Sequence, residues 1–131
     1  MCIFCEIVNG NIPSKKVYED NDFLAILDLS QTTYGHTLVM PKKHYDNFLD
    51  MPANEAGKLM EVVNIVANKI YKNLNCNGCN ILMNTNEVAG QTVMHTHVHI
   101  IPRYNENDSI EIKFTENKFD LDEVLNKING Y

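Results

Sequence analysis

The chain has 131 residues, of which 44% are hydrophobic, so it is long enough to bury one ordinary core without disulfide bonds. Its formal net charge of -6 excludes an extended basic surface for duplex nucleic acid or an anionic membrane, although a single phosphate could still be held locally. We therefore expect one domain over residues 1–131, with neither a nucleic acid polymer nor a membrane as its partner.

The N-terminal residues lack the features of a secretory signal peptide. They show no basic segment followed by a long apolar run and a small-residue cleavage site, and no later apolar stretch is long enough to span a bilayer. These absences predict a cytoplasmic location. In that reducing compartment the four cysteines are expected to be free thiols or metal ligands rather than two disulfides.

The first predicted elements are three strands. Residues 17–19 and 23–27 flank an Asp-Asn-Asp turn, which predicts a hairpin. Residues 37–40 form a short apolar run that follows a glycine and stops at a proline, as is typical of a buried strand. His36 and His44 lie at its two ends.

One long amphipathic helix is predicted from about residue 52 to residue 73, because apolar side chains recur there at three- and four-residue steps. The residues of this stripe are Leu59, Val62, Val63, Val66, Ile70 and Leu74. Two further strands are predicted at residues 79–84 and 96–101, with a loop at residues 87–91 between them.

A short terminal helix is predicted beyond a mostly polar segment at residues 104–118. Its apolar residues are Leu121, Val124, Leu125 and Ile128, and it ends near Gly130. Because strands and helices are segregated along the chain, the expected class is α+β. We predict an antiparallel sheet of about five strands with one long and one short helix.

All five histidines fall in two places, and three of them alternate along the last predicted strand. Alternate side chains of a strand share one face, so His95, His97 and His99 are expected to lie in a row, roughly 6 to 7 Å apart. An imidazole near neutral pH can be a nucleophile, a proton donor or a metal ligand. From spacing alone, a metal-binding histidine tract or a polar strand face carries about half the weight.

The loop just before the triad favours catalysis. Residues 89–92 supply backbone N–H groups, an amide and a hydroxyl that could hold phosphate oxygens. Residues 90–103 resemble the signature of the histidine triad (HIT) family, residues 35–44 are similar to its second block, and residues 2–5 look like the opening of bacterial members. The resemblance covers roughly residues 2–103 in matching order.

The resemblance implies a covalent reaction at phosphorus. His97 would attack the α-phosphate of a purine nucleotide and carry a transient nucleotidyl group that water then removes, which replaces one difficult step by two easier ones. His99 would contact the phosphate and assist the leaving group, and His36 would lie beside the site. The main-chain carbonyl of His95 would orient the His97 ring.

The resemblance also implies the residues that bind the nucleotide. Asn84, Gln91 and Thr92 match positions for phosphate oxygens or the leaving-group side, and Asp28 matches the carboxylate that binds ribose hydroxyls. The positions that match the apolar walls of the base pocket are Phe4, Ile7, Ile26 and Leu29. For these four, a plain core role is favoured by about two to one over direct contact with a ligand.

The cysteines point to a metal site with two possible completions. Cys2 and Cys5 have the spacing of a zinc knuckle. Either Cys76 with Cys79 or two histidines would supply the two further ligands of a tetrahedral zinc site. The resemblance favours Cys2, Cys5, His44 and His95, as in zinc-bearing histidine triad proteins and the related galactose-1-phosphate uridylyltransferases. It implies a structural zinc and no organic cofactor, with Cys76 and Cys79 left without a function.

Several functions remain open at this point. The leading one is a Hint-like purine nucleoside phosphoramidate hydrolase, and the second is a Fhit-like dinucleoside polyphosphate hydrolase. Residues 104–131 lack the Trp-Pro-Pro-Gly ending of eukaryotic Hint proteins, so the branch is less defined than the chemistry. The chain could also be a non-catalytic nucleotide-binding module, or it could hold a catalytic metal on the three triad histidines. The resemblance implies a homodimer.

Overall fold

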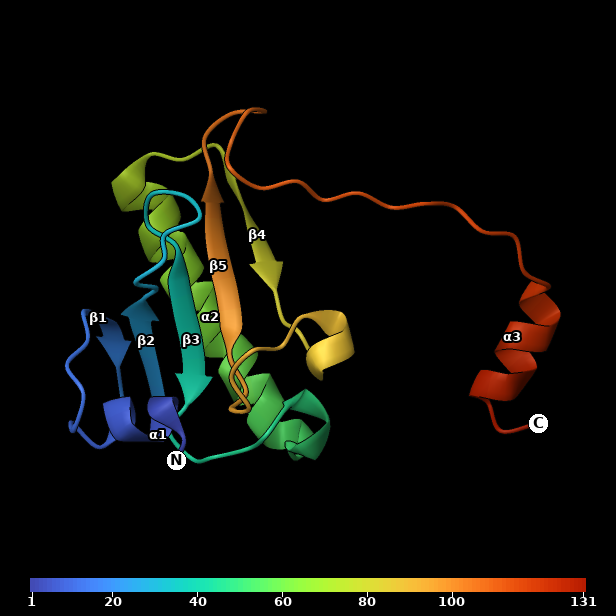
Figure 1. Cartoon of the computed structure of the whole chain (residues 1–131), viewed down its shortest axis with the longest axis horizontal. Coiled ribbons are helices and arrows are strands. Elements are labelled where there is room, and N and C mark those ends of the chain that lie inside the picture. The colour runs from blue at the N-terminus through green and yellow to red at the C-terminus, as the bar shows by residue number, and fades with distance from the viewer.

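Five antiparallel strands form one sheet in the spatial order β1-β2-β3-β5-β4 (Figure 1), in the computed structural model of residues 1–131. The strands are β1 (Lys16–Glu19), β2 (Phe23–Leu27), β3 (Thr37–Pro41), β4 (Gly78–Leu82) and β5 (Val98–Arg103). The helices are α1 (Ile3–Val8), α2 (Ala53–Leu74) and α3 (Leu121–Ile128), with 3-10 turns η1 (Phe48–Asp50) and η2 (Glu87–Ala89). The expected α+β class is confirmed.

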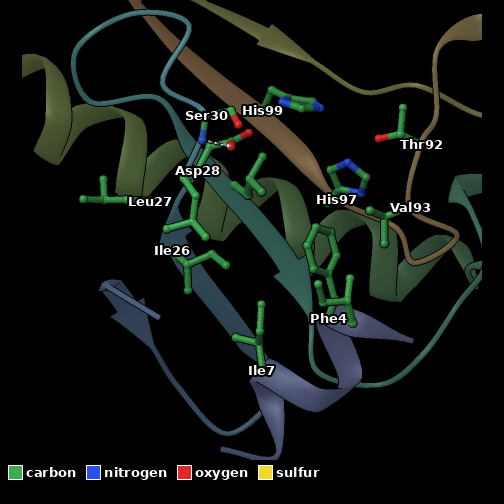
Figure 2. A pocket seen from close by; sticks show the side chains of 13 residues that line it. Phe4, Ile7, Ile26, Leu27, Asp28, Ser30, Thr92, Val93, His97 and His99 are labelled. Carbon is green, nitrogen blue, oxygen red and sulfur yellow. Dashed lines mark hydrogen bonds between the residues drawn. The ribbon is translucent and has the colours of Figure 1, made fainter. Parts of the chain in front are cut away.

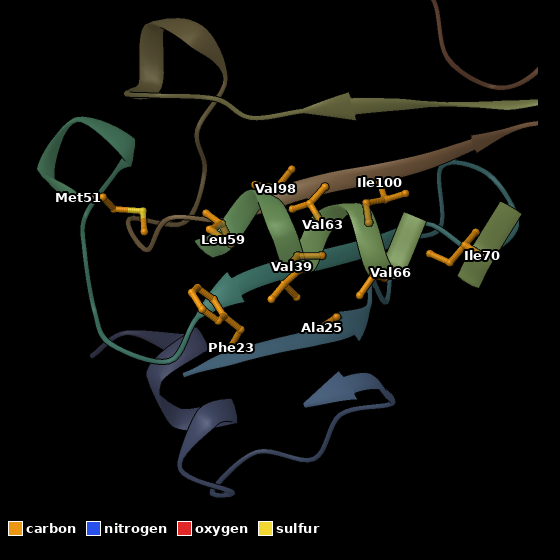
Figure 3. Close-up of a cluster of buried hydrophobic side chains, with 11 residues drawn as sticks. Phe23, Ala25, Val39, Met51, Leu59, Val63, Val66, Ile70, Val98 and Ile100 are labelled. Carbon is orange, nitrogen blue, oxygen red and sulfur yellow. The ribbon is translucent and has the colours of Figure 1, made fainter. Parts of the chain in front are cut away.

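The long helix α2 covers one face of the sheet, as Figure 3 shows. Its apolar stripe packs on side chains that point to this face from β2, β3 and β5. The buried residues of this core are Phe23, Ala25, Val39, Met51, Leu59, Val62, Val63, Val66, Ile70, Val98 and Ile100. The helix ends where Asn75 adopts a left-handed conformation with φ of 54°, a common way to stop a helix.

The opposite face of the sheet packs on α1, a six-residue helix that the sequence pattern did not reveal. Phe4 and Ile7 of α1 join a second buried cluster with Leu24, Ile26, Leu38 and Met40 of β2 and β3. The Cys2 sulfur accepts a hydrogen bond from the Cys5 N–H and so caps the helix. This packing holds the N-terminus beside the centre of the sheet.

The last strand begins two residues later than predicted. β5 starts at Val98, because the backbone N–H of Thr96 donates to Tyr45 O in the loop after β3 and leaves the ladder. Of the three triad histidines only His99 lies in the strand, where it pairs with Leu38. The expectation that alternation alone would put three imidazoles on one face is therefore wrong.

The turn before β3 depends on Gly35. Its φ of +97° is favourable only for glycine, and a Cβ there would overlap Leu74 of α2. We expect Gly35→Ala to lower the free energy of unfolding by about 2 kcal/mol in urea titrations, chiefly from the left-handed backbone. Gly57→Ala is the control. Gly57 lies inside α2 with open space around it, so this change should stabilise by up to about 1 kcal/mol. Equal effects of both variants would contradict the assignment.

The predicted terminal helix is present as α3, but it lies apart from the sheet and from α2 (Figure 1). Every residue from 111 to 131 is exposed. The apolar stripe that predicted the helix therefore covers no part of its own core. None of the helices combines the length and the apolar composition that a membrane span needs.

Candidate active site and metal centre

A cavity of about 350 Å³ opens on the α1 face of the sheet, within the size range of small-molecule sites. It is bounded by α1, the end of β2, the loop before the triad and the start of β5 (Figure 2). Eight of the residues predicted to bind or react with a nucleotide line it: Phe4, Ile7, Ile26, Asp28, Leu29, Thr92, His97 and His99.

The cavity is apolar at one end and polar at the other. Phe4, Ile7 and Ile26 form the apolar end (Figure 2). Leu29 also lines the cavity, with 92% of its surface exposed. At the polar end one oxygen of Asp28 accepts from the Ser30 N–H at 2.8 Å. Its other oxygen lies 3.6 Å from His36 Nε2. Such a site can take a molecule with one flat apolar part and one polar part.

The His97 ring is buried, and its protonation pattern follows from its contacts. Its Nδ1 lies 2.7 Å from the His95 carbonyl oxygen, and because that oxygen can only accept, Nδ1 carries the proton. The unprotonated Nε2 therefore has a free lone pair. Burial lowers the pKa of His97, which keeps the ring neutral near pH 7. The edge of Phe4, with ring centroids 5.0 Å apart, fixes its orientation.

A chain of hydrogen bonds sets the tautomer of His99. The Thr32 N–H donates to His36 Nδ1 at 3.3 Å, so His36 holds its proton on Nε2. That proton is donated to His99 Nδ1 at 2.9 Å, which leaves the proton of His99 on Nε2. Burial, with smaller contributions from His97 and His36, lowers the pKa of His99 to about 4. His99 is thus a neutral hydrogen-bond donor, with its ring centroid 5.1 Å from that of His97.

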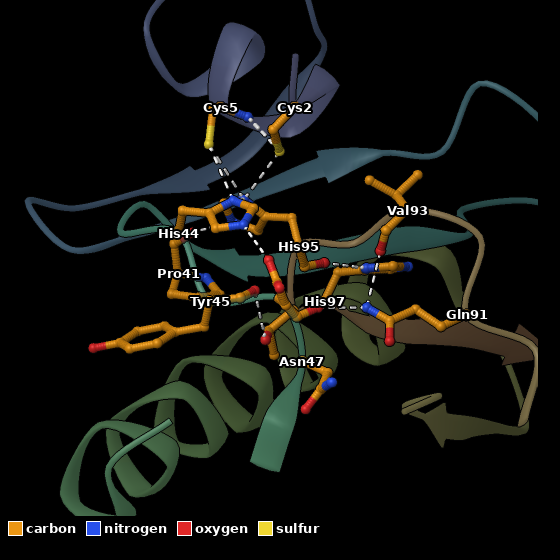
Figure 4. A network of polar contacts seen from close by, with 12 residues as sticks. Cys2, Cys5, Pro41, His44, Tyr45, Asn47, Gln91, Val93, His95 and His97 are labelled. Atoms are coloured by element: carbon orange, nitrogen blue, oxygen red, sulfur yellow. Dashed lines mark hydrogen bonds and ion pairs between the residues drawn. The ribbon is translucent and has the colours of Figure 1, made fainter. Parts of the chain in front are cut away.

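A second cluster is made of Cys2, Cys5, His44 and His95 (Figure 4). It joins the N-terminus to residues 90–97, the segment before β5 that we call the triad loop. His95 Nε2 donates to Pro41 O at 2.7 Å, and His44 Nε2 donates to Asp46 Oδ1 at 2.6 Å. Each ring therefore turns a Nδ1 lone pair inward when it is neutral, and the two Nδ1 atoms are only 3.2 Å apart. Two facing lone pairs at this distance need a cation or a proton between them.

The spacing of the four ligand atoms suits zinc. The Cys2 and Cys5 sulfurs lie 3.5 and 3.6 Å from His95 Nδ1, and the Cys5 sulfur lies 3.4 Å from His44 Nδ1. Tetrahedral zinc with its usual bond lengths places nitrogens roughly 3.3 Å apart, and a nitrogen and a sulfur roughly 3.6 Å apart. The residues present therefore fit a closed two-cysteine, two-histidine site, and the four-cysteine completion with Cys76 and Cys79 is wrong.

Comparison with known proteins agrees with this arrangement. The model of the HIT domain matches residues 9–106. The chain belongs to the HIT family. Members of this family are typically nucleotide-binding hydrolases or transferases.

Two relatives illustrate the range of the HIT family. An uncharacterised HIT-like protein of Methanocaldococcus jannaschii is 51% identical over 131 residues, which is 99% of this chain and 100% of the relative. Adenylylsulfatase HINT3 of Arabidopsis thaliana is 39% identical over 78% of this chain, which spans about half (52%) of that longer protein.

Two solved structures share the HIT fold. A HIT family member from Bacillus subtilis has a TM-score of 0.93 at 41% identity and covers 98% of this chain and 94% of its own. A zinc-bound histidine triad protein from Mycobacterium smegmatis has a TM-score of 0.77 at 40% identity, covering 81% and 77% of the two chains.

The structure contradicts one hypothesis from the sequence, a catalytic metal held by the three triad histidines. His95 turns into the cysteine cluster, whereas His97 and His99 line the cavity. A second group of possible ligands, Asp28, His36 and His99, lies within 4.8 Å. The facing nitrogens of its two histidines already share a proton in their 2.9 Å hydrogen bond, so they need no cation.

Gln91 and Asn84 lie beside the cavity rather than in its lining. The buried Gln91 amide donates to Asp46 O at 2.6 Å and to Val93 O at 3.0 Å, and its oxygen accepts from the Asn86 N–H at 2.8 Å. These bonds pin the loop before the triad and occupy the carboxamide. Asn84 Nδ2 makes a long contact of 3.4 Å with Gly90 O in the same loop.

Asp46 is the functional residue that the sequence analysis missed. Its side chain orients His44, and its carbonyl oxygen accepts from Gln91, so it links the metal cluster to the triad loop. A carboxylate two residues after a histidine ligand is a signal that could have found it, because metal-binding histidines commonly donate to such a partner. Val93 and Ser30, which also line the cavity, carried no comparable signal.

Proposed function

We propose that this HIT protein hydrolyses purine nucleoside phosphoramidates through a covalent nucleotidyl-His97 intermediate. The observation that carries the proposal is the unprotonated Nε2 of His97 at the cavity, with Nδ1–H held by the His95 carbonyl. A neutral imidazole oriented through one nitrogen is a competent nucleophile at the other.

The substrate fits the cavity with its base at the apolar end and its phosphate at the polar end. The purine base packs between Phe4, Ile7 and Ile26, with Leu29 closing the rim, and Asp28 accepts from the ribose hydroxyls. The α-phosphate then lies at His97 and His99. The cavity offers one set of apolar walls and one ribose-binding carboxylate, which suits one nucleoside and a small leaving group better than two nucleosides.

The reaction has two steps. His97 Nε2 attacks the α-phosphorus, the bond from phosphorus to the amine nitrogen breaks, and the amine leaves with a proton from water. Water then attacks the same phosphorus, the bond to His97 breaks, and a nucleoside monophosphate is released. The proton that this water loses neutralises the hydroxide left by the first step. The Nε2–H of His99 donates to a phosphate oxygen as charge develops there.

The triad loop completes the phosphate site. Thr92 offers its hydroxyl to the phosphate or to the leaving group, since it already lines the cavity. Gln91 and Asn84 act on the leaving-group side, Gln91 chiefly by holding the loop in place. His36 is a positioning residue, because it sets the tautomer of His99.

We propose a structural role for the metal. Zinc held by Cys2, Cys5, His44 and His95 would have no open position for water, and it would fix the segment that carries the His95 carbonyl. None of the four cysteines forms a disulfide, which suits a reducing compartment, so we place the protein in the cytoplasm. We propose no organic cofactor. A homodimer is the proposed assembly, as the family resemblance implies.

The Arabidopsis relative, named as an adenylylsulfatase, supports attack at the phosphorus of an adenylyl group. The proposal is tested by comparing kcat/KM for adenosine 5′-phosphoramidate and for diadenosine tetraphosphate, because specificity is the ratio of these values. We expect the phosphoramidate to be preferred by at least about tenfold. The reverse preference would assign the Fhit-like activity instead, and no turnover of either would leave a nucleotide-binding module.

A further inference from the structure

Residues 111–131, which we call the arm, form no hydrogen bond or ion pair with the rest of their own chain. Every residue of the arm is exposed. Its hydrogen bonds and its one ion pair, between Lys127 and Glu123, join arm residues to one another. Residues 104–110 connect β5 to the arm, which begins as an extended segment and carries α3 near its end (Figure 1).

The helix at the end of the arm needs a surface to pack on. α3 has only eight residues, and isolated helices shorter than about 12 residues are marginal in water. It is nevertheless capped by Asp120 and carries a continuous apolar stripe on one face. The exposed large hydrophobic residues of the arm are Ile112, Phe114, Phe119, Leu121, Val124, Leu125, Ile128 and Tyr131. Such a row marks an interaction surface.

The arm has the same position in a solved relative. The Bacillus subtilis structure covers 98% of this chain, so its alignment includes the arm, and a TM-score of 0.93 requires that the arm superposes. The Mycobacterium smegmatis structure covers 81% of the chain and has the lower score of 0.77. The same placement of the arm in two proteins leaves its apolar stripe free to pack on a second copy of the chain.

The free edge of the sheet at β4 is a surface on which a second copy of the chain could pack. β4 is the last strand on its side, with no partner on its outer edge, and Ile81 and Leu82 are exposed there. The segment that leads from β5 into the arm starts beside β4, because Arg103 pairs with Gly78. The arm then runs past β4 on the side away from β1 (Figure 1). A copy that met β4 edge to edge would therefore lie within reach of the arm.

We propose that the two copies of a homodimer exchange arms, so that the apolar stripe of α3 packs on the domain of the second copy. The test places a benzophenone-bearing amino acid at position 128 of the full chain and irradiates the purified protein. A covalent product of twice the 15.0 kDa chain mass is expected. Cross-links only within one chain, or none, would overturn the proposal, even if light scattering showed a dimer.

Two variants of equal charge sharpen this test. In the cross-linking chain, Leu125→Asp places a carboxylate on the apolar stripe, and Asn126→Asp places one on the polar face of the same helix. We expect Leu125→Asp to reduce the cross-linked dimer at least about tenfold and to abolish hydrogen-exchange protection of α3, with Asn126→Asp changing neither. Equal behaviour of the two variants would contradict the proposal. Neither result depends on whether the protein hydrolyses phosphoramidates.

Discussion

Replacing His97 with alanine is expected to lower kcat for adenosine phosphoramidate by on the order of 10⁴-fold or more, as removal of other covalent nucleophiles does. The ring supplies the only imidazole lone pair that the hydrogen bonds of the site leave free in the cavity. Water alone would have to replace a nucleophile held at the phosphorus. Steady-state hydrolysis, followed by chromatography of the released nucleotide, measures the loss.

A second substitution separates chemistry from folding. His97→Asn keeps a side chain that can donate to the His95 carbonyl, but it removes the nucleophilic ring nitrogen. We expect it to be as inactive as the alanine variant, with a Tm within a few degrees of the unaltered protein. Activity within tenfold of that protein in either folded variant would rule out His97 as the nucleophile.

The second large effect is expected at the metal cluster. Cys5→Ala removes one of four ligands, and because metal binding contributes directly to folding free energy, it should release zinc and lower Tm by at least about 10 °C. Metal analysis of the purified protein and thermal unfolding measure the two consequences. The cluster joins the N-terminus to the triad loop, so its loss frees both segments.

Cys79→Ala is the matched control for this change. The same atoms are removed, but Cys79 is an exposed thiol on β4, outside the cluster. Zinc content should be unchanged and Tm should move by no more than about 3 °C. The metal assignment fails if Cys5→Ala keeps its zinc, or if both variants lose the same amount of stability.

Much of the fold could be predicted because it depends on local periodicity. The stripe from Leu59 to Ile70 predicted α2 to within about one residue at each end, and the apolar runs predicted β2 and β3. The helix α1 was missed because six residues are too few for a helical period to show. The start of β5 was misplaced because Thr96 bonds to Tyr45, a residue far away in the sequence.

In the candidate site, too, some features could be predicted from the sequence and others depend on the folded chain. The resemblance to HIT proteins identified residues that the structure brings together, both around the cavity and in the metal cluster. The tautomers of His97 and His95 could not be predicted, because they are set by carbonyl oxygens that the folded chain places against the rings. The apolar stripe of α3 predicted a helix but did not indicate which surface covers it.

The central claim is a covalent bond between His97 and phosphorus. Mixing the protein with excess adenosine phosphoramidate, quenching it in alkaline denaturant within the first turnover and measuring its mass tests that bond directly. We predict a chain heavier by one adenylyl group, located on the peptide that contains His97 and missing from His97→Ala. A full first turnover with no adduct, or an adduct on a different residue, would contradict the mechanism.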